Sequence, residues 1–219
     1  MPSPIENISV LFLLFLSCFL NCNTMAQENT EAQLIALESS GELLAPETLV
    51  QRVDKDLKAI RSKFPAVAEV HATGKWQPGR LLISGVTKQS LDAINTSQYG
   101  PIEASSIFQD TIFSVVFQKP YNPEVLSKIL KRDFGIASAD PDGIIGGSSS
   151  VTLKTDSSGI NTYAFMKGWG DCPSGCINKH FWTFTIGPDA NSVKLVEEKG
   201  SDLSGIDQEG GAPVVGLFF

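Results

Sequence analysis

The stretch IEASSIFQDTIFSVVF, residues 102–117, decides the predicted fold. Its pattern predicts two strands, 102–108 and 112–117, joined by a tight turn at Gln109 and Asp110. The second strand is apolar on both faces, whereas a sheet with helices on one side should alternate apolar and polar residues. We therefore expect its second face to be covered, either by a partner protein or by the chain's own C-terminal strands.

Helix and strand signals flank this pair on both sides. Before it, RLLIS at 80–84 predicts a strand, and Thr87 is an N-cap for a short helix that reaches Ile94. After it, NPE at 122–124 supplies a cap, a first-turn proline and a first-turn acid for a second helix. A further strand is expected at 135–139, with a turn directly after it.

The resulting order over residues 75–147 is strand, helix, strand, strand, helix, strand, the ferredoxin-like βαββαβ arrangement of an α+β fold. Apolar residues at helical spacing predict another helix over 46–64, and a strand is expected over 67–76. Beyond the Gly- and Ser-rich stretch 146–150 only strand signals follow, which predicts a small antiparallel β extension.

The N-terminal stretch has the features of a cleavable signal peptide. Its apolar run over 8–20 suits a signal core and is shorter than the ~20 residues of a membrane span. Thr24 and Ala26 supply small residues before a cleavage site. We expect export to a secreted or periplasmic location, with lipoprotein anchoring at Cys18 or Cys22 as the weaker alternative, because the residues before each cysteine fit poorly.

Charge and pattern together set the organisation of the chain. The net charge of −7 argues against binding to nucleic acid or to anionic membrane surfaces, which select for Lys and Arg. The expected parts are, in order, a signal peptide, a linker or N-terminal arm, a helix with an α+β domain, a β extension, and a polar tail with an apolar end: 1–26, 27–45, 46–147, 148–198 and 199–219.

Three short motifs resemble the prosegment family of subtilisin-type proteases. They are PGRLLI at 78–83, NPEV at 122–125 and FGIASADPD at 134–142, and no protease domain accompanies them. The resemblance implies a domain that assists folding of a protease and blocks its active site, docking through one sheet face. The segment implied to lie in the substrate cleft consists of Asp142, Gly143, Ile144, Ile145 and Gly146. The alternative is that this segment is a flexible exit to the next domain.

No catalytic constellation is evident in the sequence. A subtilisin-type enzyme needs Ser, His and Asp, but there are only two histidines, His71 and His180, and no Gly-x-Ser-x-Gly elbow. We expect no catalytic residue, no cofactor and no metal, and a protein that is not an enzyme.

The pair Cys172 and Cys176 is expected to form a structural disulfide, because an exported chain meets an oxidising compartment. Its C-x₃-C spacing differs from that of thioredoxin-like redox sites. A redox role, and a metal site completed by Asp171 and His180, are the alternatives. The segment GWGDCPSGC around the pair resembles a motif of uncharacterised bacterial secreted proteins.

Two tryptophans, Trp169 and Trp182, flank the cysteine loop, where they would either fill a core or bind sugar or peptide. Taken together, the sequence predicts a secreted, non-catalytic binding module, a stand-alone propeptide-like inhibitor or chaperone of a subtilisin-like protease. The alternative is a structural or cell-surface interaction protein that shares the prosegment fold and binds another protein.

Overall fold

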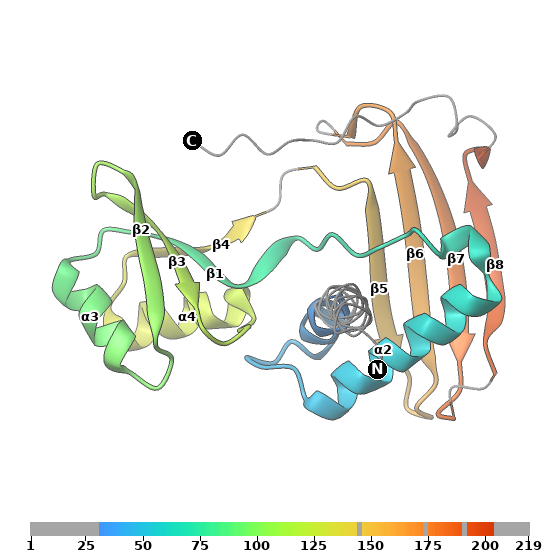
Figure 1. The fold of residues 1–219 in the computed structure, drawn as a ribbon, viewed down its shortest axis with the longest axis horizontal. Coiled ribbons are helices and arrows are strands. Elements are labelled where there is room, and N and C mark those ends of the chain that lie inside the picture. The colour runs from blue at the N-terminus through green and yellow to red at the C-terminus, as the bar shows by residue number, and fades with distance from the viewer. Residues whose placement is uncertain (1–30, 144–145, 173–174, 190–191, 204–219) are drawn as a thin grey trace, which may run out of the picture.

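The computed structural model describes residues 31–143, 146–172, 175–189 and 192–203. In these ranges the chain is a mixed α+β protein with two four-stranded antiparallel sheets, which lie beside each other (Figure 1). The predicted α+β class is therefore confirmed. No helix in these ranges is long and apolar enough to cross a membrane.

The first sheet has the strand order β2-β3-β1-β4 and carries two helices on one face. Leu81 and Ile83 of β1 and Val115 of β3 are fully buried against Leu126 and Leu130 of the second helix. The elements along the chain are β1 (Trp76–Ser84), α3 (Lys88–Thr96), β2 (Ile102–Phe108), β3 (Ile112–Phe117), α4 (Pro123–Phe134) and β4 (Ser138–Gly143).

Local chemistry sets the starts of these helices as the sequence predicted. The side chain of Thr87 accepts a hydrogen bond from the amide of Ser90 at 3.1 Å, which caps α3. The side chain of Asn122 accepts one from the amide of Glu124 at 3.0 Å, which caps α4. Gly135 ends α4 in the left-handed conformation, at φ +65°.

Because of that glycine cap, the fourth strand begins later than predicted. It starts at Ser138 instead of residue 135, and the turn expected over 140–143 is wrong, since β4 continues to Gly143. Pro141 is tolerated there because β4 is an edge strand.

The strand predicted over 67–76 is also wrong. Residues Pro65–Val67 form a 3-10 turn, and β1 begins only at Trp76. Val67 and Val70 are buried, at 0% and 1% exposure, but their stretch pairs with no strand. The apolar pattern of this stretch therefore reflects the burial of its valines and not the pairing of its backbone with a strand.

The second sheet has its strands in sequence order, β5-β6-β7-β8. Helix α2 (Glu47–Lys63) packs on it, and so does the helical segment 31–40. The strands are β5 (Ser149–Thr155), β6 (Asn161–Trp169), β7 (Asn178–Ile186) and β8 (Lys194–Gly200). The sequence grouped α2 with residues 75–147, whereas its apolar face packs on the other sheet. An amphipathic pattern shows that one face is buried but not which sheet buries it.

A buried carboxylate holds α2 on this sheet. Asp56 is fully buried and pairs with Arg52 at 2.8 Å. It also accepts hydrogen bonds from Asn161 at 2.7 Å and from the hydroxyl of Tyr163 at 3.1 Å, both on β6. Burial, together with the neighbouring Asp56 charge, raises the pKa of Tyr163. The hydroxyl therefore stays protonated and able to donate.

The helical segment 31–40 lies where the two sheets meet. Ile35 packs in the core of the second sheet, while Leu34 and Leu37 pack against Trp76 at the start of β1. The side-chain amide of Asn122 donates to the carbonyl of Leu37 at 3.4 Å. This buried helix lies within the stretch 27–45, for which the sequence predicted a linker or arm.

Candidate functional site

One face of the first sheet is left open by the described part of the chain. Helices α3 and α4 cover the opposite face, and the second sheet stands beside the first without lying on it (Figure 1). Val115 and Phe117 of β3 point to the helices and are buried, whereas Ile112 on the open side is 38% exposed. Phe108, its partner across the ladder, is 58% exposed.

Within the described ranges, the chain's own C-terminal strands therefore do not cover this face. The other predicted cover is a partner protein. Leu82 and Val116 lie on the same face and are half-buried, next to the polar side chains of Arg80 and Glu103. The result is an accessible surface of mixed apolar and polar character. Contiguous exposed apolar surface marks interaction sites, and the exposed pair Phe108 and Ile112 makes this face a candidate for one.

The predicted cleft segment leaves this sheet at its edge. Asp142 and Gly143 are the last residues of β4, and Gly143 pairs with Trp76 of β1. Ile144 and Ile145 lie outside the described residues. Gly146 follows them with a left-handed φ of +72°.

Hydrogen bonds at Ser149 fix the chain shortly after this segment. The hydroxyl of Ser149 donates to the carbonyl of His71 at 2.6 Å, and the hydroxyl of Thr73 donates to the carbonyl of Ser149 at 2.8 Å. The segment is therefore tethered to the first sheet at one end and to residues 71–73 at the other.

The predicted disulfide between Cys172 and Cys176 is confirmed. It closes the loop between β6 and β7, and Cys176 is 8% exposed. Gly168 lies so close to this cysteine that a Cβ there would be 2.5 Å from its sulfur. The bridge therefore packs against the sheet and shapes the loop.

His180 is held in place by neighbours from the chain itself. His180 Nδ1 lies 2.8 Å from the carbonyl of Ser201, and its Nε2 lies 3.2 Å from Glu198. Trp182 packs beside the imidazole, with ring centroids 4.4 Å apart, and its indole donates to Glu198 at 3.0 Å. Both ring nitrogens of His180 therefore serve this structural cluster.

The tryptophans differ in burial. Trp182 is 2% exposed and belongs to the second core, while Trp169 is half-buried at the end of β6. In the ranges that the structure describes, no group of three or more His, Cys, Asp or Glu side chains could hold a metal ion.

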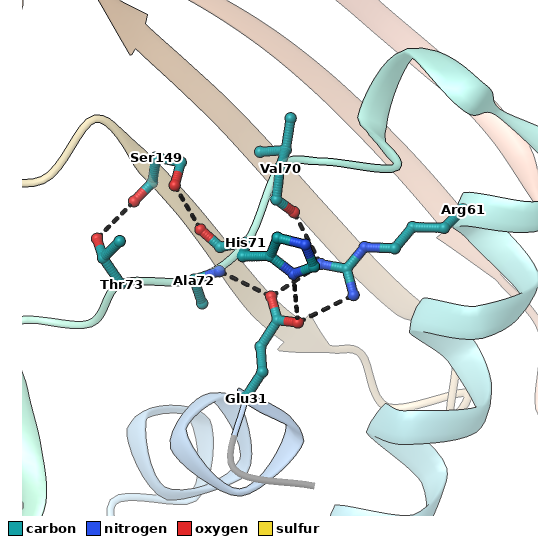
Figure 2. A network of polar contacts seen from close by, with 7 residues as sticks. All are labelled: Glu31, Arg61, Val70, His71, Ala72, Thr73 and Ser149. Atoms are coloured by element: carbon teal, nitrogen blue, oxygen red, sulfur yellow. Dashed lines mark hydrogen bonds and ion pairs between the residues drawn. The ribbon is translucent and has the colours of Figure 1, made fainter. Parts of the chain in front are cut away.

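The sequence did not single out one buried network, which Figure 2 shows. Glu31 accepts two hydrogen bonds from Arg61, at 2.8 and 2.9 Å, and one from the amide of Ala72 at 2.7 Å. Burial alone would raise the pKa of Glu31, but Arg61, the Ala72 amide and His71 outweigh burial and lower it. The network joins the first described helix to α2 and to residues 70–73, so its role is to hold the fold.

Comparison with protein-family models, with curated proteins and with solved structures gave no match for this chain. Function therefore has to follow from the surfaces and contacts of the chain itself.

Proposed function

We propose that this chain is an exported, non-catalytic binding module that docks a subtilisin-like serine protease through the open face of its first sheet. The segment 142–146 would enter the substrate cleft and block it. The observation that carries the proposal is the exposed apolar surface on a sheet whose other face is packed by helices.

The connectivity supports a prosegment-type, ferredoxin-like unit. The order β1-α3-β2-β3-α4-β4, with strands arranged β2-β3-β1-β4, fits the split βαβ pattern. The three prosegment-like motifs fall on β1, on the start of α4 and on its end with β4. This agreement between local motifs and topology is a fold-level analogy, so the docking surface has to carry the functional argument.

The contacts on either side of the segment indicate how it would inhibit. Gly143 pairs with Trp76, and Ser149 is hydrogen-bonded to His71, so the chain is anchored before and after residues 144–145. Holding a loop before binding reduces the conformational entropy lost when it is ordered in a cleft. Ile144 and Ile145 supply two apolar side chains for the pockets of a protease.

A binding titration tests the docking face. The mature protein is titrated against subtilisin-like proteases, free and with the active-site serine covalently blocked. We expect binding that weakens when the active site is blocked, and that weakens at least tenfold in Ile112→Asp, about 1.4 kcal/mol or more.

The matched control is Ile177→Asp, which adds the same charge at a side chain that is 76% exposed on the other half of the molecule. It should bind as the wild type does. Equal loss in both variants, or no binding to any protease, would count against this docking face.

A specific observation favours a second function, that of a structural or surface interaction protein with no protease role. The chain is fixed by its own contacts at Gly143 and at Ser149, on either side of residues 144–145, as a simple connection between two sheets would be. Binding of another extracellular protein by the open face, with the segment dispensable, would support this alternative.

We further propose that the chain is exported and cleaved after Ala26. The disulfide agrees with an oxidising compartment, in which such bonds persist. Mass spectrometry of the protein recovered from the extracytoplasmic fraction should find Gln27 at the N-terminus. A full-length chain or a lipid-modified cysteine there would contradict it.

A further inference from the structure

The four sheet edges of the described chain are not equally protected against pairing with another strand. Natural edges are blunted by charged residues, proline or covering segments. The edge strand β4 carries Asp140, Pro141 and Asp142, and β8 carries two Lys and two Glu. The start of β5 is covered by hydrogen bonds to residues 71–73.

Strand β2 has little of this protection. Its sequence IEASSIF contains no Lys and no Pro, and Glu103 is its one charge. All of its residues except the half-buried Ile102 are exposed, including Ile107 and Phe108 at 58% each. An exposed edge of this composition is a template for strand addition.

The hydrogen bonds of β2 show which backbone groups face outward. The amide of Gln118 donates to the carbonyl of Pro101 at 3.2 Å, so Pro101 faces β3. In an antiparallel pair such bonded positions alternate, which places Glu103 and Ser105 toward β3. Ile102, Ala104 and Ser106 therefore direct their amide and carbonyl groups to the free edge.

One of these three is already used. The amide of Ile102 donates to the side-chain oxygen of Asn95 at 2.9 Å. On the other side, an irregularity between Ser106 and Phe108 interrupts the ladder. The open stretch of edge is thus short, with Ala104 and Ser106 as its two fully available residues.

We propose that this edge pairs with β2 of a second copy of the chain, antiparallel about a twofold axis at Ser105. In this register Ala104 lies opposite Ser106 of the second copy, and the reverse holds by symmetry. Each of these two pairs can exchange two backbone hydrogen bonds, since their groups face outward. The β2-containing sheets of the two copies then form one continuous sheet.

The side chains are compatible with the same register. Glu103 lies opposite Ile107 of the second copy, so the charge on β2 does not meet itself. Ser105 lies opposite Ser105 of the second copy in a non-hydrogen-bonded pair, where side chains approach most closely. Ile107 and Phe108 come beside Ile102 of the other chain and lose exposed apolar surface.

The short open stretch favours a second copy over a long extended peptide. A peptide would run past Ala104 and Ser106 into positions where the edge is capped or irregular. The twofold arrangement uses the available groups on both chains at once. Because the contact is small, we expect a weak dimer, micromolar or weaker.

Sedimentation velocity over a roughly hundredfold concentration range measures this equilibrium. The wild type should shift from monomer to dimer. Ala104→Pro should remain monomeric, since proline removes an outward amide without breaking a bond to β3. Ala104→Val keeps that amide and should dimerise. A monomeric wild type, or a dimer that persists in Ala104→Pro, would overturn the proposal.

A charge exchange at Ser105 tests the twofold axis itself. Ser105→Lys and Ser105→Glu should each be monomeric, because like charges would lie directly opposite. An equimolar mixture should restore a heterodimer. Homodimers of either variant, or a mixture that stays monomeric, would rule out this axis. No protease is present, so the result is independent of the docking experiment.

Discussion

The most informative perturbation of the fold is Asp56→Ala. This carboxylate is fully buried between α2 and β6, and it accepts hydrogen bonds from Arg52, Asn161 and Tyr163. Removing it leaves the hydroxyl of Tyr163 and the amide of Asn161 without their acceptor, in side chains that are 0% and 3% exposed.

The size of the effect follows from these partners. Breaking a buried ion pair by removing one member costs about 3–5 kcal/mol. Arg52 is 23% exposed and still donates to the carbonyls of Gly187 and Pro188. Breaking its ion pair with Asp56 therefore contributes little to the loss of stability. We therefore expect a loss of about 3 kcal/mol, a large part of the 5–15 kcal/mol typical of a folded protein.

Urea unfolding monitored by circular dichroism measures this loss. Asp54→Ala is the matched control on the same helix, since Asp54 makes a surface pair with Lys58 at 3.1 Å. Such pairs contribute about 0.3–0.5 kcal/mol. A loss below about 1 kcal/mol for Asp56→Ala, or equal losses for the two variants, would refute the assignment of this carboxylate as the tie between α2 and its sheet.

Three further predictions concern the Glu31 network, the disulfide and the glycine beside it. Because the pKa of Glu31 is lowered in the fold, the stabilisation that it provides is present above its unfolded pKa of about 4.3 and is lost as pH falls through the lower folded value. Glu31→Gln should thus have a lower free energy of unfolding than the wild type near neutral pH, and this difference should shrink in unfolding curves measured in acid. A difference that does not depend on pH would contradict the ion pair with Arg61. Replacing both Cys172 and Cys176 by Ser should cost about 2 kcal/mol or less in thermal unfolding, because the loop is short, and loss of the folded sheet signal would show a larger role. Gly168→Ala should cost about 1–3 kcal/mol by crowding the sulfur and the Cβ of Cys176, and the cost should shrink when Cys176 is also replaced by Gly, which removes both atoms; an unchanged cost would point to strain elsewhere.

Local signals in the sequence predicted the first sheet well. The caps at Thr87 and Asn122 act through their own side chains within two or three residues, so sequence alone is sufficient to locate them. The turn at Gln109 and Asp110 is confirmed, with both residues at positive φ. Strand β3 packs one face on the helices, whereas its second face, for which the two-sided apolar pattern predicted a cover, is only partly buried by the described residues.

The parts that sequence could not predict depend on distant partners. Helix α2 shows an apolar face, but the choice of the second sheet depends on Asp56 meeting Asn161 and Tyr163 more than a hundred residues later. Likewise, Glu31 is an ordinary acidic residue in a polar stretch until the fold brings Arg61 to it. The open face of the first sheet was predicted to need a cover, either a partner protein or the C-terminal strands, and the sequence could not decide between them.

Residues 142–146 are proposed to block a protease cleft, and inhibition of a panel of subtilisin-like proteases by the mature protein would test this proposal. The wild type is compared with the double variant Ile144→Asp and Ile145→Asp, after both are shown to unfold at the same urea concentration. We expect inhibition by the wild type and loss of inhibition in the double variant. No inhibition at high concentration, or simple cleavage within this segment, would contradict it.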